Sequence, residues 1–128
     1  LGDSPFERML KLTNCLIAGE EQFTLAAIST LDKEGKDLKQ FVSEYLSFVL
    51  ELTRYILFKD ISATNIPAYL EHSNDPMISV VNTTALENAL GWYNYLTDRL
   101  LTLKSAIKYD TSVKAVVEAY LLQVCRRV

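Results

Sequence analysis

The side chains that could hold a metal ion are few and far apart in the sequence. His72 is the only histidine, and it lies in a polar stretch beside Ser73 and Asn74. One histidine and the distant Cys15 and Cys125, with no Cys-x-x-Cys pair, do not make a usual zinc site. We therefore expect no metal site. A solvated loop position is favoured for His72, and a pH-sensing or ligand-binding role is the alternative.

Both cysteines lie inside apolar helical patterns. Free cysteine is among the most often buried residue types, and disulfides are rare in reducing compartments. We expect two buried free thiols, with a disulfide or a reactive thiol as the alternative.

Residue patterns for catalysis or cofactor binding are missing from the sequence. There is no Gly-x-x-x-x-Gly-Lys-Ser/Thr loop, no Gly-x-Gly-x-x-Gly turn and no Glu-x-x-His motif. The adjacent Glu20 and Glu21 suit the positive end of a helix dipole better than a general acid/base pair, because neighbouring helical side chains point in different directions. We expect no catalytic residue, no cofactor and no phosphate-binding loop, and an enzyme is only a minor alternative.

The elements that position these residues are predicted to be helices. Three prolines and four glycines in 128 residues are too few for an all-β chain. Ser4-Pro5-Phe6-Glu7 predicts a capped helix that ends at Gly19. A second helix is expected from Glu20 to Gly35, and Asp37 caps a third that runs to about Phe58.

The second half of the chain is less regular. Residues 60–82 predict two short helical turns, at 67–71 and after Pro76. A fifth segment is expected from Thr83 or Thr84 to Ile107, and a last helix starts near Asp110-Thr111. We therefore predict an all-α bundle of about five to six helices, with residues 1–128 forming one helical domain.

Apolar residues at spacings of three and four predict which face of each helix is buried. In the first and second helices these are Phe6, Met9, Leu10, Thr13, Leu16 and Ile17, then Phe23, Ala26, Ala27 and Leu31, with Leu25 and Ile28 beside them. In the third they are Leu38, Phe41, Val42, Tyr45, Leu46, Val49, Leu52, Tyr55 and Ile56. In the fifth segment they are Leu86, Ala89, Leu90, Tyr93, Leu96, Leu100, Leu103 and Ile107.

Two surfaces are candidates for contact with a partner. The last helix buries Val113, Val116, Val117, Tyr120, Leu121 and Val124, yet Ala115, Ala119 and Leu122 make its other side apolar too. Such a helix is either central in its fold or pressed against a partner. Trp92, Tyr95 and Arg99 lie along one line of the fifth segment and are residue types enriched at interfaces. Alternatively, Trp92 covers the core of its own chain.

Charge and hydropathy narrow the class of partner. Residues 1–64 carry 7 Lys/Arg against 10 Asp/Glu, and residues 65–128 carry 6 of each, so neither half favours direct nucleic-acid binding. No apolar run approaches the roughly 20 residues of a membrane span, and no signal peptide opens the chain. We expect a soluble, cytoplasmic protein that binds other proteins, and the missing initial Met suggests a fragment.

Several segments, in order along the chain, resemble one family. These are the break Ala18-Gly19-Glu20, the helix end Leu31-Asp-Lys-Glu-Gly35, the hinge and helix Gly35-Lys-Asp-Leu-Lys-Gln-Phe-Val-Ser-Glu-Tyr-Leu, and the closing Val116-Val-Glu118-Ala-Tyr-Leu-Leu. Together they are similar to the third, helical domain of the gamma/tau subunit of the bacterial DNA polymerase III clamp loader. Ser112 stands where proline is common in that family.

The resemblance implies a structural role in DNA replication. The parent subunit carries two preceding ATPase domains, and its third domain joins clamp-loader subunits, delta and delta-prime among them, into a ring called the collar. This chain would then be a collar-like C-terminal oligomerisation module that binds no ATP, with Trp92, Tyr95, Arg99, Ala115, Ala119 and Leu122 as candidate subunit-interface residues. A delta-prime-like collar is possible within the same class. The alternative is a helical small-molecule-binding regulatory domain, with Tyr45, Tyr55 and Tyr93 lining an internal pocket.

Overall fold

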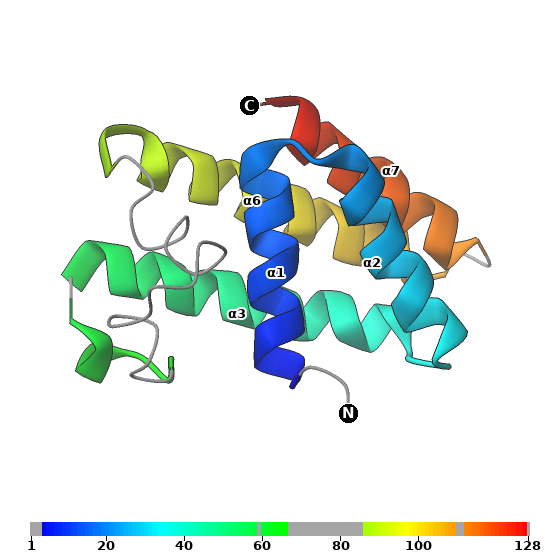
Figure 1. The fold of residues 1–128 in the computed structure, drawn as a ribbon, viewed down its shortest axis with the longest axis horizontal. Coiled ribbons are helices and arrows are strands. Elements are labelled where there is room, and N and C mark those ends of the chain that lie inside the picture. Colours follow the sequence, from blue (N-terminus) through cyan, green and yellow to red (C-terminus); the bar gives the residue numbers. More distant parts are fainter. Residues whose placement is uncertain (1–3, 59, 67–85, 110–111, 128) are drawn as a thin grey trace.

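The fold is all-helical, as the sequence predicts. The computed structural model describes residues 4–58, 60–66, 86–109 and 112–127, and no strand occurs in these ranges. The elements are α1 (Pro5–Ala18), α2 (Glu21–Lys33), α3 (Leu38–Phe58), a short 3₁₀ turn (Ile61–Ala63), α6 (Leu86–Ala106) and α7 (Val113–Arg127) (Figure 1). Several predictions concern residues outside these ranges. They are the turns at 67–71 and after Pro76, the loop position of His72, and the caps at Thr83, Thr84 and Asp110-Thr111.

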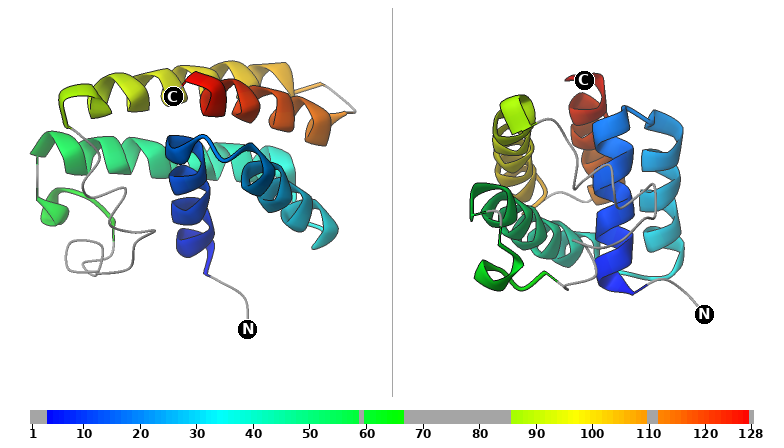
Figure 2. Two further views of the ribbon diagram at one scale, coloured as in Figure 1. Left: turned by 45° about the horizontal axis from the view of Figure 1, so that its top comes forward. Right: turned by 60° about the vertical axis from the view of Figure 1, so that its left-hand side comes forward.

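The helices form two layers. α3 and α6 run antiparallel, side by side, and make the most extensive helix pairing in the described part of the chain. The α1–α2 hairpin and α7 cover one side of this pair (Figure 2). α7 contacts each of α1, α2, α3 and α6, so the all-round apolar character of the last helix matches a central position.

The hairpin of α1 and α2 follows the predicted signals. Ser4 Oγ accepts a hydrogen bond from the Glu7 amide at 3.2 Å, and Pro5 occupies the first turn. Gly19 adopts the left-handed conformation at φ 70°, which lets the Glu20 amide donate to the carbonyl of Cys15 at 2.9 Å. Most residues with a Cβ are strained there, so Gly19 sets the sharp turn between the two helices.

Gly19→Ala is expected to destabilise the fold by about 1 kcal/mol, because alanine is strained at positive φ. Gly91→Ala is the matched control. Gly91 lies within α6, and a Cβ built there has no atom within 4 Å. Alanine at that position should stabilise by about 0.5–1 kcal/mol. Denaturant unfolding of both variants measures the two changes in stability. If Gly19→Ala and Gly91→Ala change the free energy of unfolding equally, the proposed role of Gly19 in the turn is wrong.

The buried face of α2 differs from the prediction. Thr24, Ile28 and Leu31 are buried, whereas Phe23 is 64 % exposed and Ala26 is exposed. Thr24 tolerates burial because its hydroxyl donates to the Glu20 carbonyl at 2.9 Å and lies 3.4 Å from the Cys125 sulfur of α7. Packing against α7 therefore rotates α2 so that a threonine faces inward and the phenylalanine faces outward.

α3 supplies the centre of the core as predicted. Asp37 caps it by accepting from the amides of Lys39 at 3.0 Å and Gln40 at 3.3 Å. Phe48, which the pattern did not include, is also buried and meets Phe6 of α1 edge to face, with ring centroids 5.3 Å apart. The predicted positions on this helix are buried, except for the half-buried Phe41 and Tyr55.

α6 presents most of its predicted stripe to α3. Ala89, Tyr93, Leu96, Leu100, Leu103 and Ile107 are buried. Leu90 is the exception, because it is 39 % exposed and lies at the edge of the packed face. The side chain of Leu86 lies outside the described part of the structure.

Candidate binding surfaces

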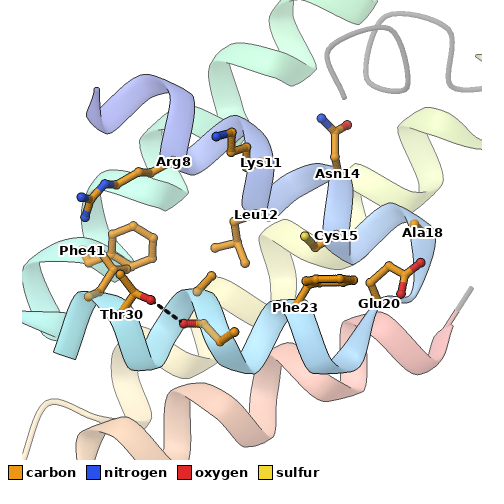
Figure 3. A pocket seen from close by; sticks show the side chains of 13 residues that line it. Arg8, Lys11, Leu12, Asn14, Cys15, Ala18, Glu20, Phe23, Thr30 and Phe41 are labelled. Atoms are coloured by element: carbon orange, nitrogen blue, oxygen red, sulfur yellow. Dashed lines mark hydrogen bonds between the residues drawn. The ribbon is translucent and has the colours of Figure 1, made fainter. Parts of the chain in front are cut away.

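An open groove of about 760 Å³ runs between α1 and α2. Leu12, Cys15 and Ala18 line it from α1, and Phe23, Ala26, Ala27, Thr30 and Leu31 line it from α2. Phe41 of α3 stands at one end (Figure 3). We call this the Phe23 groove. Because most of its lining is apolar or small, another helix could approach its backbone closely.

The two ends of the groove carry opposite charges. Arg8 and Lys11 lie towards the end near Phe41, and Glu20 lies at the other, beside Phe23 (Figure 3). Arg8 forms a bidentate ion pair with Glu34, the residue that follows α2. Arg8 Nη2 lies 3.0 Å from Glu34 Oε2. This hydrogen bonding lowers the pKa of Glu34. This ion pair links the start of α1 to the end of α2. A second ion pair links α2 to α7, where Arg126 Nε lies 2.7 Å from Glu21 Oε1.

The cysteines are free thiols, and only one is fully buried. Cys125 is buried, and Cys15 is half-buried where it lines the groove. Burial is the main cause that raises the pKa of both thiols above its usual range. Both are therefore protonated at neutral pH, which disfavours nucleophilic chemistry.

The three tyrosines predicted to line an internal pocket do not line the groove. Tyr45 is fully buried, and its hydroxyl lies 2.8 Å from the hydroxyl of Thr13. Tyr93 is also fully buried, and its hydroxyl has no hydrogen-bond partner among the described residues. Tyr55 is half-buried. Burial raises the pKa of both Tyr45 and Tyr93.

The line of Trp92, Tyr95 and Arg99 makes contacts within the chain. The Arg99 guanidinium lies 5.8 Å from the ring centre of Tyr120 on α7, and that of Arg127 lies 4.4 Å from the ring centre of Tyr95. Trp92 is half-buried against the core. Arg99 and Tyr95 therefore join α6 to α7. On α7, Ala115 and Ala119 are exposed and Leu122 is half-buried.

A second apolar surface lies along the outer edge shared by α3 and α6. Leu50 and Leu57 of α3 are 44 % and 56 % exposed, and Leu90 and Leu101 of α6 are 39 % and 53 % exposed. We call these four side chains the leucine seam. Singly exposed leucines are common on protein surfaces, but a row of them is typical of an interface. The sequence pattern alone did not single out this seam.

Within the described ranges, no cluster of His, Cys, Asp and Glu could hold a metal ion. No helix among them is long and apolar enough to span a membrane. No family model, curated protein or solved structure matches the chain. The Phe23 groove and the leucine seam are therefore the features of the described structure that bear on function.

Proposed function

We propose that this chain is a helical oligomerisation module, of the kind that forms the collar of a DNA polymerase III clamp loader. The observation that carries the proposal is the pair of exposed apolar surfaces, the Phe23 groove and the leucine seam. A module that only folds gains nothing by exposing these side chains, whereas burying them against another subunit is favourable by about 25 cal/mol per Å² of apolar surface. The family resemblance supports the same role.

A ring of subunits needs two different contact surfaces on each copy, because each copy touches one neighbour on either side. The groove and the seam are two such surfaces, since the groove lies mainly between α1 and α2 and the seam runs along α3 and α6. The chain would contribute contact surface only, and the ATPase chemistry of a clamp loader would belong to other domains. Its partners would be the collar domains of gamma/tau, delta and delta-prime-like subunits in the cytoplasm.

Mixing the chain with delta or delta-prime collar fragments tests the partner class. Size-exclusion chromatography with light scattering should show a complex that forms with these fragments and not with an unrelated helical bundle of similar charge. If the chain binds the unrelated bundle as well as it binds the collar fragments, the clamp-loader assignment is contradicted. The chain would then be a less specific association module.

A small-molecule-binding domain is the second candidate, and one observation favours it. The groove volume lies within the range of about 300–1,000 Å³ typical of ligand sites. Asn14, at the edge of the groove, has a buried amide without a hydrogen-bond partner in the described part of the chain. However, Figure 3 shows this side chain pointing away from Phe23. A stabilising thermal shift with small polar molecules, lost in Asn14→Ala, would favour this function.

A further inference from the structure

We propose that the Phe23 groove of one copy receives the leucine seam of a second copy, so that copies join head to tail. This inference rests on the proposed function and names the two surfaces that would carry it. Phe23 and the four seam leucines make up five of the seven large apolar side chains that stand exposed in the described part of the chain.

The seam leucines of α6 lie on the edge that borders α3. Tyr95 and Arg99 mark the other edge, because both are packed against side chains of α7. A helix turns by about 100° per residue, so Leu90 and Leu101 lie within about 20° of each other. By the same geometry they are turned by about 120–180° from Tyr95 and Arg99. They therefore form one line on the α3 side.

The seam leucines of α3 lie on the edge that borders α6. Phe48 marks the opposite edge, since its ring meets Phe6 of α1. Leu50 and Leu57 are two turns apart and are turned by about 160–180° from Phe48. The exposed leucines of the two helices thus flank the same outer seam, and a single apolar side chain from a partner could contact both rows.

The groove and the seam lie on opposite sides of α3, because Phe41 of the groove is turned by about 160–180° from Leu50 and Leu57. Figure 2 shows the α3–α6 pair on one side of the molecule and the α1–α2 hairpin on the other. One copy can therefore bind one neighbour through its groove and another through its seam at the same time. A pairing of unlike surfaces of this kind is heterologous, and it produces a ring or a filament instead of a closed two-fold dimer.

The acidic end of the groove complements cations that lie beside the seam. Glu20 lies one helical turn before Phe23. Arg54 lies between Leu50 and Leu57 in the sequence; its side chain is 61 % exposed and lies 3.8 Å from the Glu51 carboxylate. Lys104 is exposed on the seam edge of α6. Seating Phe23 between the leucines brings the carboxylate of Glu20 towards these cations, and such complementarity sets orientation.

Complementation between two single variants tests the head-to-tail arrangement. Phe23→Asp removes the groove surface and keeps the seam, and Leu57→Asp does the reverse. Each should weaken self-association about tenfold or more, as expected for an interface anchor. Mixed in equal amounts, they should form a complex of two chains that does not grow further, because one intact groove and one intact seam remain. Phe58→Asp is the matched control, since Phe58 is also 64 % exposed but lies outside both surfaces.

A charge exchange provides a second readout on the same surfaces. Glu20→Lys and Arg54→Glu should each weaken association, and the double variant should restore it at low salt. Circular dichroism of every variant should match the wild type, because all the changed side chains are exposed. If the wild type associates and neither Phe23→Asp nor Leu57→Asp weakens it, the named surfaces are wrong while the oligomerisation function stands. Two variants that stay monomeric on mixing overturn the head-to-tail pairing.

Discussion

Leu96→Ala should lower the free energy of unfolding by about 3–5 kcal/mol, the range found for leucines removed from well-packed cores. Leu96 is completely buried in α6, on the face that packs against α3. Truncation removes the burial of its branched side chain and leaves a cavity between the two longest helices. Since small domains are stable by only about 5–15 kcal/mol, this loss is a large share of the total.

Leu101→Ala is the control for this prediction, because it makes the same chemical change on the same helix. Leu101 is 53 % exposed, so the variant should lose less than about 1 kcal/mol of stability. It should nevertheless weaken self-association, since Leu101 belongs to the seam. Urea unfolding at low protein concentration measures both stabilities. Similar losses for the two variants would mean that α6 does not present the described face to α3.

Alkaline pH should destabilise the fold, mainly through Tyr45 and Tyr93. Burial raises the pKa of both phenols above its usual range, so the folded state keeps their protons after the unfolded chain has released them. The stability from the neutral phenols is fully present below about pH 10, the unfolded pKa of tyrosine, and it is lost as pH rises further. Two such groups remove about 2.7 kcal/mol per pH unit.

Tyr93→Phe isolates this effect, because the Tyr93 hydroxyl has no hydrogen-bond partner in the described part of the chain. Its removal should cost little at neutral pH and should reduce the alkaline slope to about 1.4 kcal/mol per pH unit. The thiols of the buried Cys125 and the half-buried Cys15 add a smaller loss that begins near about pH 8.5. Unfolding curves between pH 8 and pH 11 give the slopes. A stability that stays level beyond about pH 10 would contradict the burial of these two hydroxyls.

Local signals in the sequence predicted the described helices and their ends well. Ser4, Gly19 and Asp37 act within one helical turn of themselves, so their roles can be inferred without knowing what packs nearby. The stripe of α3 was also predicted correctly, since its apolar positions are dense enough to leave only one buried face. The all-α fold class follows from these features.

The faces of α2 and α6 depend on their neighbours, and there the pattern was less reliable. Thr24 and Phe23 are adjacent, and only the position of α7 decides that threonine is buried and phenylalanine exposed. Leu90 and Leu96 are the same residue type in one helix, and only α3 distinguishes them. The groove and the seam were therefore not predictable from periodicity. Trp92, Tyr95 and Arg99 were chosen from residue type, and in the structure they make contacts within the chain.

We propose that this helical domain binds copies or relatives of itself. Sedimentation equilibrium of the chain alone, from micromolar to millimolar concentration at low salt, tests this claim most directly. We expect the weight-average mass to rise continuously above the 14.5 kDa of one chain as concentration increases. A mass that stays at 14.5 kDa up to millimolar concentration would contradict it.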